Sequence, residues 1–244
     1  FLRKTIGPGP VFSSVIKGNA YGHGIETFVP LAEACGVRHF SVFTADEALR
    51  AVGARTEDSS VLIMGFVADE ELAWAVEHGV AFNVFETGRL AAAKEAARRV
   101  GKPAKVHLEI ETGMHRTGLE GDDLERAVEV VSDNREFLST EGVCTHLAGA
   151  ESIGNHVRIK GQLERFEKLC GQLRDVGIDP DFRHVASSAA LLTYPETTMD
   201  MVRCGIAQYG FWPSTETRMH YLLRDGDGGA ARRDPLKRVL TWKS

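Results

Sequence analysis

The chain has 244 residues, of which 43% are hydrophobic, and a formal net charge of −5 at pH 7. This length is enough for one large barrel or two small domains with a sizeable core. The basic residues are scattered and balanced by acids, which argues against a nucleic-acid surface. The apolar runs reach about six residues, which is too short to span a membrane. The four cysteines form no CxxC pair, so we expect reduced thiols in a cytoplasmic protein.

Eight short runs rich in β-branched and aromatic residues predict strands. They cover 11–16, 38–43, 61–66, 80–85, 105–111, 141–148, 181–187 and 200–210. Helical spacing of apolar residues lies between them, at 25–36, 44–54, 69–79, 86–101, 122–132, near 155–176 and, in a short segment, at 187–192. Within 44–54, Thr44 and Glu47 have the spacing of a helix capping box.

This alternation predicts the α/β class and, over residues 1–212, a (β/α)8 barrel of the TIM type. A doubly wound sheet is the alternative, but no long crossover marks a reversal of strand order. The polar, Gly- and Arg-rich stretch 213–237 is typical of a loop or linker. Residues 238–244 resemble the start of a further, truncated β domain. Because the sequence opens without a methionine and stops inside this predicted strand, we interpret it as part of a longer chain.

Chemically active side chains follow several of the predicted strands. In a (β/α)8 barrel the C-terminal ends of the strands build the active site, so these residues are expected around one rim. A lysine after a buried strand, if withdrawn from water, is a good amine for a Schiff base with an aldehyde. Hydroxyl groups and backbone N–H groups nearby can cradle a phosphate, and the two together indicate pyridoxal 5'-phosphate. The candidates are Lys17, Tyr21, Arg116, His146, Ser188, Arg203, Gly205 and Ile206.

The segment VIKGNAYGHG, residues 15–24, resembles the cofactor-lysine motif of the alanine racemase family of fold-type III pyridoxal-phosphate enzymes. Four further segments are similar to family segments in the same order: HLEIETGMHRTG, THLAGAES, HVASSAALL and MVRCGIAQYG. Together they cover the predicted barrel. The resemblance implies that the family's C-terminal β domain is largely absent from this sequence.

The resemblance implies a role for each candidate. Lys17 carries the cofactor and acts as the base on one face of the substrate Cα, while Arg116 lies near the substrate carboxylate. His146 packs against the pyridine ring and Arg203 donates to its nitrogen, so these four form the expected catalytic group. The expected phosphate ligands are Tyr21, Ser188, Gly205 and Ile206. Glu109 stands where many members carry a carbamylated lysine, so it is expected to support Arg116 with a carboxylate.

The implied function is interconversion of L- and D-alanine, which supplies D-alanine for peptidoglycan. The implied assembly is a head-to-tail homodimer in which a tyrosine of the partner subunit's C-terminal domain is the second base. A racemase of another small amino acid such as serine, a related decarboxylase and a non-catalytic pyridoxal-phosphate-binding barrel are the alternatives. A metal site is a rival interpretation, because His107, Glu109 and Glu111 alternate on one strand face and His146 follows the next strand; we expect no metal.

Overall fold

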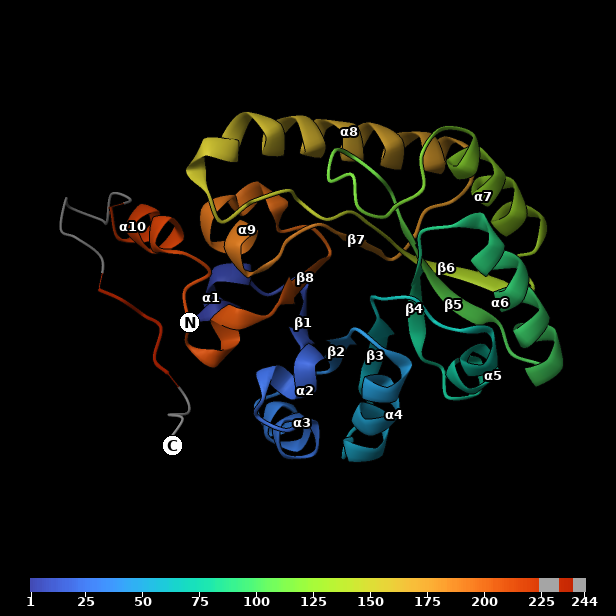
Figure 1. Ribbon diagram of the computed structural model, residues 1–244, viewed down its shortest axis with the longest axis horizontal. Coiled ribbons are helices and arrows are strands. Elements are labelled where there is room, and N and C mark those ends of the chain that lie inside the picture. The colour runs from blue at the N-terminus through green and yellow to red at the C-terminus, as the bar shows by residue number, and fades with distance from the viewer. Residues whose placement is uncertain (224–232, 239–244) are drawn as a thin grey trace.

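The computed structural model describes residues 1–223 and 233–238. In this part of the chain, eight parallel strands alternate with helices and curve into a barrel (Figure 1). The strands are β1 (Val11–Val15), β2 (His39–Val42), β3 (Ser60–Ile63), β4 (Ala81–Val84), β5 (Ala104–Glu109), β6 (Leu138–Cys144), β7 (Phe182–His184) and β8 (Met201–Cys204).

The strands follow one another around the sheet in the order β7-β6-β5-β4-β3-β2-β1-β8. Two backbone hydrogen bonds join the β7 and β8 segments across the remaining gap, from Asp200 N to Arg183 O at 3.1 Å and from Arg203 N to Ala186 O at 3.0 Å. The predicted (β/α)8 barrel is therefore confirmed, and the doubly wound alternative is wrong. The predicted eighth strand is shorter than expected, because a 3-10 turn, η3 (Ile206–Tyr209), begins directly after Gly205.

The helices surround the strands, as their apolar spacing predicts. They are α1 (Leu2–Ile6), α2 (Lys17–Tyr21), α3 (Ile25–Ala34), α4 (Ala45–Ala54), α5 (Asp69–Glu77), α6 (Thr87–Val100), α7 (Gly121–Asp133), α8 (His156–Asp175), α9 (Ser188–Thr193) and α10 (Thr215–Leu223). In α6 the buried side chains Leu90, Ala93 and Ala97 recur at helical spacing. They pack toward β4, whose residues are all buried. Such burial on both faces is typical of a parallel sheet covered by helices.

Residues 213–237, expected as a loop or linker, contain helix α10, so that expectation is wrong for part of the segment. Ser214 Oγ accepts a hydrogen bond from Thr217 N at 3.0 Å and its hydroxyl donates to Glu151 O at 2.6 Å, which fixes the start of the helix against the barrel. The expected start of a second domain, 238–244, lies outside the described residues after Arg238. Within the described part of the chain, no helix is long and apolar enough to cross a membrane.

Candidate active site

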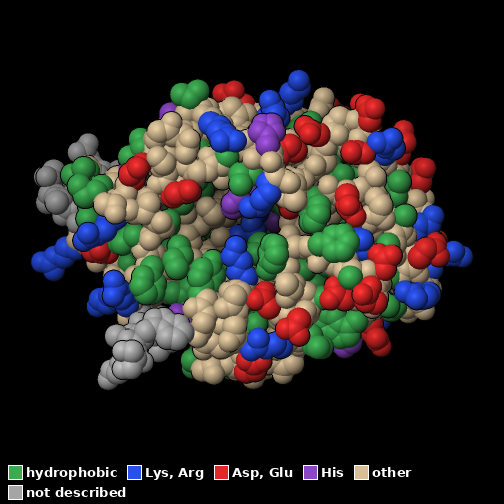
Figure 2. Space-filling model, viewed as in Figure 1, with side chains coloured by type: hydrophobic (Ala, Val, Ile, Leu, Met, Phe, Trp, Pro, Cys, Tyr) green, Lys and Arg blue, Asp and Glu red, His purple; other side chains and the backbone are tan. Residues whose placement is uncertain are grey.

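A cavity of about 410 Å³ lies at the C-terminal ends of the strands. Its size is in the range of small-molecule sites, roughly 300–1,000 Å³. Figure 2 shows basic and histidine side chains gathered around a hollow near the middle of this face. All nine candidate residues line the cavity, although they come from five different strand ends: Lys17, Tyr21, Glu109, Arg116, His146, Ser188, Arg203, Gly205 and Ile206.

The chain makes a left-handed turn directly after Lys17. The φ angles of Gly18, Asn19, Ala20 and Tyr21 are 62°, 54°, 55° and 53°. For each of the three that carry a Cβ this conformation costs roughly 1–2 kcal/mol, so the surroundings have to hold it. Backbone strain of this kind is often concentrated at functional sites. Here the turn places both Lys17 and Tyr21 on the cavity wall.

Lys17 itself is exposed at the mouth of the cavity. The strand ends at Val15 and Ile16 is fully buried, so Lys17 is the first residue of the chain beyond the packed interior. Lys17 is therefore not withdrawn from water in this structure. The amine is nevertheless accessible from the cavity, as a Schiff-base lysine has to be.

The four predicted phosphate ligands lie together on one side of the cavity. Ser188 Oγ accepts hydrogen bonds from Gly205 N at 2.9 Å and from Ala207 N at 3.3 Å. A Cβ placed on Gly205 would lie 2.5 Å from the Tyr21 hydroxyl, so a larger residue here would require the Tyr21 ring to move. Burial raises the pKa of Tyr21, which keeps its hydroxyl protonated as a donor. Hydroxyls and backbone N–H groups thus converge beside Ile206, the first residue of η3.

Arg203 is buried in the floor of the cavity. Its guanidinium donates to His184 O at 2.7 Å, to Thr145 O at 2.9 Å and also to His184 Nδ1. Burial lowers the pKa of Arg203, yet a guanidinium stays protonated in proteins and can only donate. These contacts orient the group rigidly at the cavity floor.

A pair of buried imidazoles supports Arg203 from inside the barrel. Because Arg203 donates to Nδ1 of His184, that nitrogen accepts, and Nε2 of His184 carries the hydrogen. His184 Nε2 therefore donates to His107 Nδ1, at 2.8 Å. Burial, with a smaller contribution from neighbouring cationic groups, lowers the pKa of His107 to about 3 and that of His184 well below its usual value. Both rings are neutral at physiological pH.

Glu109 is buried beside the cavity and both its oxygens are bound. Oε2 accepts from Asn83 Nδ2 at 3.0 Å and Oε1 from the Thr117 hydroxyl at 2.6 Å. Arg116 is exposed, and no ion pair between Glu109 and Arg116 occurs within residues 1–223 and 233–238. The predicted support of Arg116 by Glu109 is thus not the arrangement of this structure, because two closer donors occupy the carboxylate.

The rival metal interpretation is not favoured by these contacts. His107 binds His184 and Glu109 binds Asn83 and Thr117, so neither directs free ligand atoms at a common point. Among the residues that the structure describes, no group of three or more His, Cys, Asp or Glu side chains is arranged to hold a metal ion.

The loop that carries Arg116 is built around one carboxylate. The buried side chain of Glu111 accepts from the backbone N–H groups of Gly113, of Met114 at 2.7 Å and of His115 at 2.8 Å. Burial alone would raise the pKa of Glu111, but the N–H donors and the His115 ring outweigh it and hold the pKa below its usual value. His115 has a φ of 56°, a left-handed conformation, and its N–H is one of the three donors to Glu111.

His146 is half-buried at the end of β6. Burial, followed by the charges of Arg203, Arg116 and Lys17, lowers its pKa to about 3, so its imidazole is neutral at physiological pH. Gln162 of α8 fixes the backbone here: its Nε2 donates to His146 O at 3.1 Å, and its Oε1 accepts from Ala148 N at 2.8 Å. A neutral, fixed ring can pack against a flat ligand without adding a charge.

Comparison with known proteins identifies the family to which this barrel belongs. The family model described as "Alanine racemase, N-terminal domain" matches residues 1–213. An alanine racemase of Desulforamulus reducens is 33% identical over 224 residues, which are 91% of this chain and 60% of that protein. The chain belongs to the alanine racemase family. It spans about 60% of the length of the curated alanine racemases that it matches, and the predicted resemblance is confirmed.

Solved alanine racemases have the same fold. The enzyme of Streptomyces coelicolor A3(2) superposes with a TM-score of 0.83 at 34% identity, covering 88% of this chain and 57% of that one. The enzyme of Bacillus anthracis with bound L-Ala-P superposes with a TM-score of 0.82 at 30% identity, covering 89% of this chain and 56% of that one. With sequence identities of 34% and 30%, both solved enzymes resemble this chain in sequence as well as in fold.

Some residues of this alanine racemase barrel were missed by sequence reasoning. Asn83 and Thr145 line the cavity and bind Glu109 and Arg203 respectively. A signal for Asn83 was present, since a polar residue inside an apolar strand run faces either a partner or a ligand. Thr145 binds Arg203 through its backbone carbonyl, which no side-chain pattern reveals.

Proposed function

We propose that the chain is the pyridoxal-phosphate-binding barrel of an amino-acid racemase that interconverts L- and D-alanine. The observation that supports this most strongly is that Lys17, the predicted phosphate ligands, Arg203 and His146 all line one cavity. These residues lie up to 189 positions apart in the sequence, from Lys17 to Ile206. The membership of the family supports the same substrate.

The residues present fit pyridoxal phosphate. The Tyr21 and Ser188 hydroxyls both lie close to the backbone of Gly205, so hydroxyl groups are gathered at this corner of the cavity as a phosphate site requires. Lys17 would carry the cofactor through its amine, and Arg203 would donate to the pyridine nitrogen. Bound in this way, the cofactor acidifies the Cα proton of an attached amino acid by withdrawing electrons from it.

The protein's own groups then control the proton. Lys17 takes or returns the Cα proton on one face of the substrate. Because Arg203 only donates, and His184 and His107 behind it are neutral, no group in the floor supplies a proton to the ring nitrogen. A pyridoxal phosphate held in this way would withdraw electrons from Cα only mildly, which would suit racemisation. Arg116 at the cavity mouth can attract the substrate carboxylate.

Inversion needs a proton donor on each face of Cα. We infer that the second donor is a tyrosine of the partner subunit in a head-to-tail homodimer, in keeping with the resemblance of the motifs. In this proposal the protein works in the cytoplasm and its product, D-alanine, enters peptidoglycan. Residues 238–244 would then lead into the C-terminal β domain that contributes this interface.

The test follows exchange of the alanine Cα hydrogen for deuterium, because this exchange needs a base on one face of Cα only. The chain is loaded with pyridoxal phosphate and incubated with L-alanine in deuterium oxide, and loss of the Cα hydrogen is followed by NMR with chiral analysis of the product. We expect exchange far above that of free pyridoxal phosphate, and slower exchange with L-serine. Cofactor binding without exchange would identify a non-catalytic barrel, and faster exchange with serine would reassign the substrate.

A further inference from the structure

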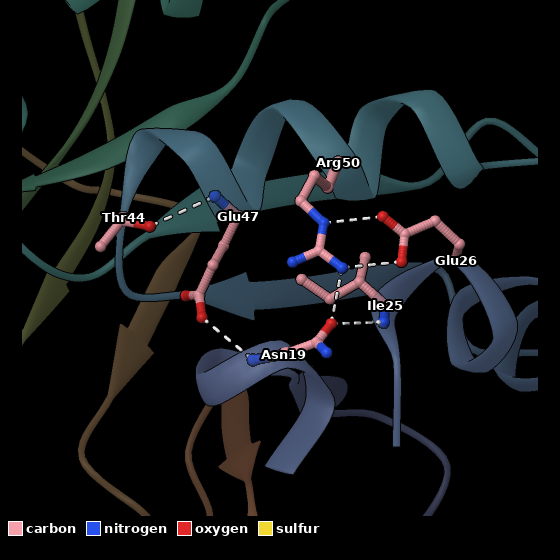
Figure 3. Close-up of polar contacts among 6 residues, drawn as sticks. All are labelled: Asn19, Ile25, Glu26, Thr44, Glu47 and Arg50. Carbon is pink, nitrogen blue, oxygen red and sulfur yellow. Dashed lines mark hydrogen bonds and ion pairs between the residues drawn. The ribbon is translucent and has the colours of Figure 1, made fainter. Parts of the chain in front are cut away.

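Glu47 connects helix α4 to the turn that follows Lys17. Its spacing from Thr44 predicts a capping box, and the first half of that box is present, since Glu47 N donates to Thr44 Oγ1 at 3.2 Å. The carboxylate does not complete the box. Oε1 instead accepts from Gly18 N at 2.6 Å and Asn19 N at 3.2 Å, while Oε2 accepts from Phe43 N at 2.9 Å. Figure 3 shows this side chain reaching from α4 to the turn.

A second contact from α4 holds the same turn by its side chain. Asn19 Oδ1 accepts from Arg50 NH2 at 2.6 Å and from Ile25 N at 3.1 Å. Arg50 is itself fixed by Glu26, with two contacts of 2.7 and 2.8 Å (Figure 3). Glu47 and Arg50 lie three residues apart, so they project from neighbouring positions on one helix face. The turn is thus bound at its backbone and at its side chain.

The left-handed turn needs such a partner. In a left-handed stretch the first N–H groups have no preceding turn to bind, just as at the start of any helix. The other N–H groups of the turn find carbonyl partners, with Ala20 N bound to Ile16 O at 2.7 Å and Gly22 N to Gly18 O at 2.9 Å. The N–H groups of Gly18 and Asn19 are the two that Glu47 accepts.

We infer that Glu47 is a positioning residue for Lys17: its carboxylate holds the left-handed turn that aims Lys17 and Tyr21 into the cavity. This inference rests on the proposed function for its catalytic consequence, since Lys17 is the proposed cofactor amine. Its structural part, that Glu47 holds the turn, does not depend on the cofactor. Because Oε2 also binds Phe43 N at the end of β2, Glu47 ties together the rim ends of two adjacent strands.

A matched control separates this role from helix capping. Glu71 occupies the corresponding place in α5, and its Oε2 accepts from Ala68 N at 2.8 Å. In Glu71→Gln the remaining amide oxygen can take over that single bond. Glu47 uses both of its carboxylate oxygens as acceptors. In Glu47→Gln the side-chain NH2 group must therefore face a backbone N–H. Glu47→Asp keeps the charge but is one methylene too short to span from α4 to the turn.

Two measurements are made on each variant of the 244-residue chain. Hydrogen exchange of the Gly18 and Asn19 amides is followed by NMR without cofactor, and pyridoxal phosphate is titrated with the Lys17 Schiff-base absorbance as the readout. We expect Glu47→Gln and Glu47→Asp to exchange these amides at least ten-fold faster and to bind the cofactor about ten-fold more weakly. We expect Glu71→Gln to match the unsubstituted chain in both.

The outcomes separate this inference from the proposed function. If the unsubstituted chain forms no Schiff base at Lys17, the proposed function fails, while the exchange of Gly18 and Asn19 still decides the role of Glu47. If Glu47→Gln matches Glu71→Gln in amide exchange, Glu47 does not hold the turn. If Glu47→Asp binds the cofactor as the unsubstituted chain does, charge rather than reach matters. Either of the last two results overturns the inference. Should Glu47→Gln not fold, Glu47→Asp carries the same test.

Discussion

The loops after β1 and β5 solve one structural problem in two ways. Residues 17–24 and 110–119 each contain left-handed residues, and each is held by a carboxylate that collects backbone N–H groups. In the second loop the carboxylate is Glu111, two to four residues from the groups it binds. In the first loop it is Glu47, which comes from a helix 29 residues further along the chain.

The two carboxylates also differ in burial. Glu111 is buried, whereas Glu47 is half-buried and its contacts with the turn are at the surface. A buried carboxylate that loses its charge accepts hydrogen bonds more weakly and offers one fully competent oxygen instead of two, whereas water can replace part of what Glu47 provides. We therefore expect the β5 loop to depend on its carboxylate for stability and the β1 loop to depend on it for geometry.

The largest expected effect is on attachment of the cofactor, and it separates the role of the loop after β1 from that of the loop after β5. Lys17→Ala removes the only amine that the β1 turn brings to the cavity, so borohydride reduction should leave no pyridoxyl label on the peptide containing residue 17. Arg116→Ala changes the β5 loop and leaves the amine in place, so the label should persist. Peptide mapping by mass spectrometry after reduction reads both results. A label on another lysine in the unsubstituted chain would contradict the role of Lys17.

Next in size is the loss of charge at Glu111. Glu111→Gln replaces a charged acceptor of three N–H groups and should lower the free energy of unfolding by about 3 kcal/mol. Glu47→Gln, at the half-buried position, should cost about 1 kcal/mol or less. Urea unfolding at neutral pH measures both. Equal costs would mean that burial does not separate the two carboxylates.

The Glu111 contribution has a defined pH dependence. Its pKa is lowered in the folded chain, so the stabilisation is fully present above the unfolded value, about 4.3, and is lost as the pH falls through the folded pKa. The difference in unfolding free energy between the unsubstituted chain and Glu111→Gln should therefore shrink in acid. A difference that stays constant from pH 7 to pH 3 would show that the carboxylate charge is not the stabilising group.

The contrast between the local carboxylate Glu111 and the distant carboxylate Glu47 also explains which features could be predicted from the sequence. Strand order, barrel class and the nine cavity residues could be predicted, because strand ends in a parallel barrel meet at one rim and the motif after Lys17 is long. Glu111 lies inside the motif it holds. Thr44 and Glu47 were correctly paired as a helix start, but the destination of the Glu47 carboxylate could not be predicted, because local spacing carries no information about which loop packs against a helix.

Other misses have the same origin. Glu109 was expected to bind Arg116 seven residues away, but it binds Thr117, eight residues away, and Asn83 on the adjacent strand. The partner of Glu109 depends on which side chains the barrel turns inward, and Arg116 is exposed at the cavity mouth. Lys17 was expected at the rim of the barrel and it lines the cavity there, but the left-handed turn that begins one residue later could not be predicted from the composition.

The smallest effect on cofactor binding should come from Gly18, and it sharpens the comparison most. Gly18 has a φ of 62° and an added Cβ would meet nothing within 4 Å, so Gly18→Ala adds backbone strain without a clash. Gly79, at the end of α5, has a φ of 66° and the same open surroundings, which makes Gly79→Ala a matched control. Each should lower the free energy of unfolding by about 1 kcal/mol.

The two glycine variants should also agree in cofactor binding, because alanine at position 18 keeps the N–H that Glu47 accepts. The backbone strain then lowers the free energy of unfolding, while the Glu47 carboxylate still holds the turn in place. We expect pyridoxal phosphate to bind Gly18→Ala within about three-fold of the unsubstituted chain, since a change below about 0.7 kcal/mol in binding corresponds to that factor. A loss of ten-fold or more for Gly18→Ala, with Gly79→Ala unchanged, would mean that the glycine rather than Glu47 sets the geometry of the turn.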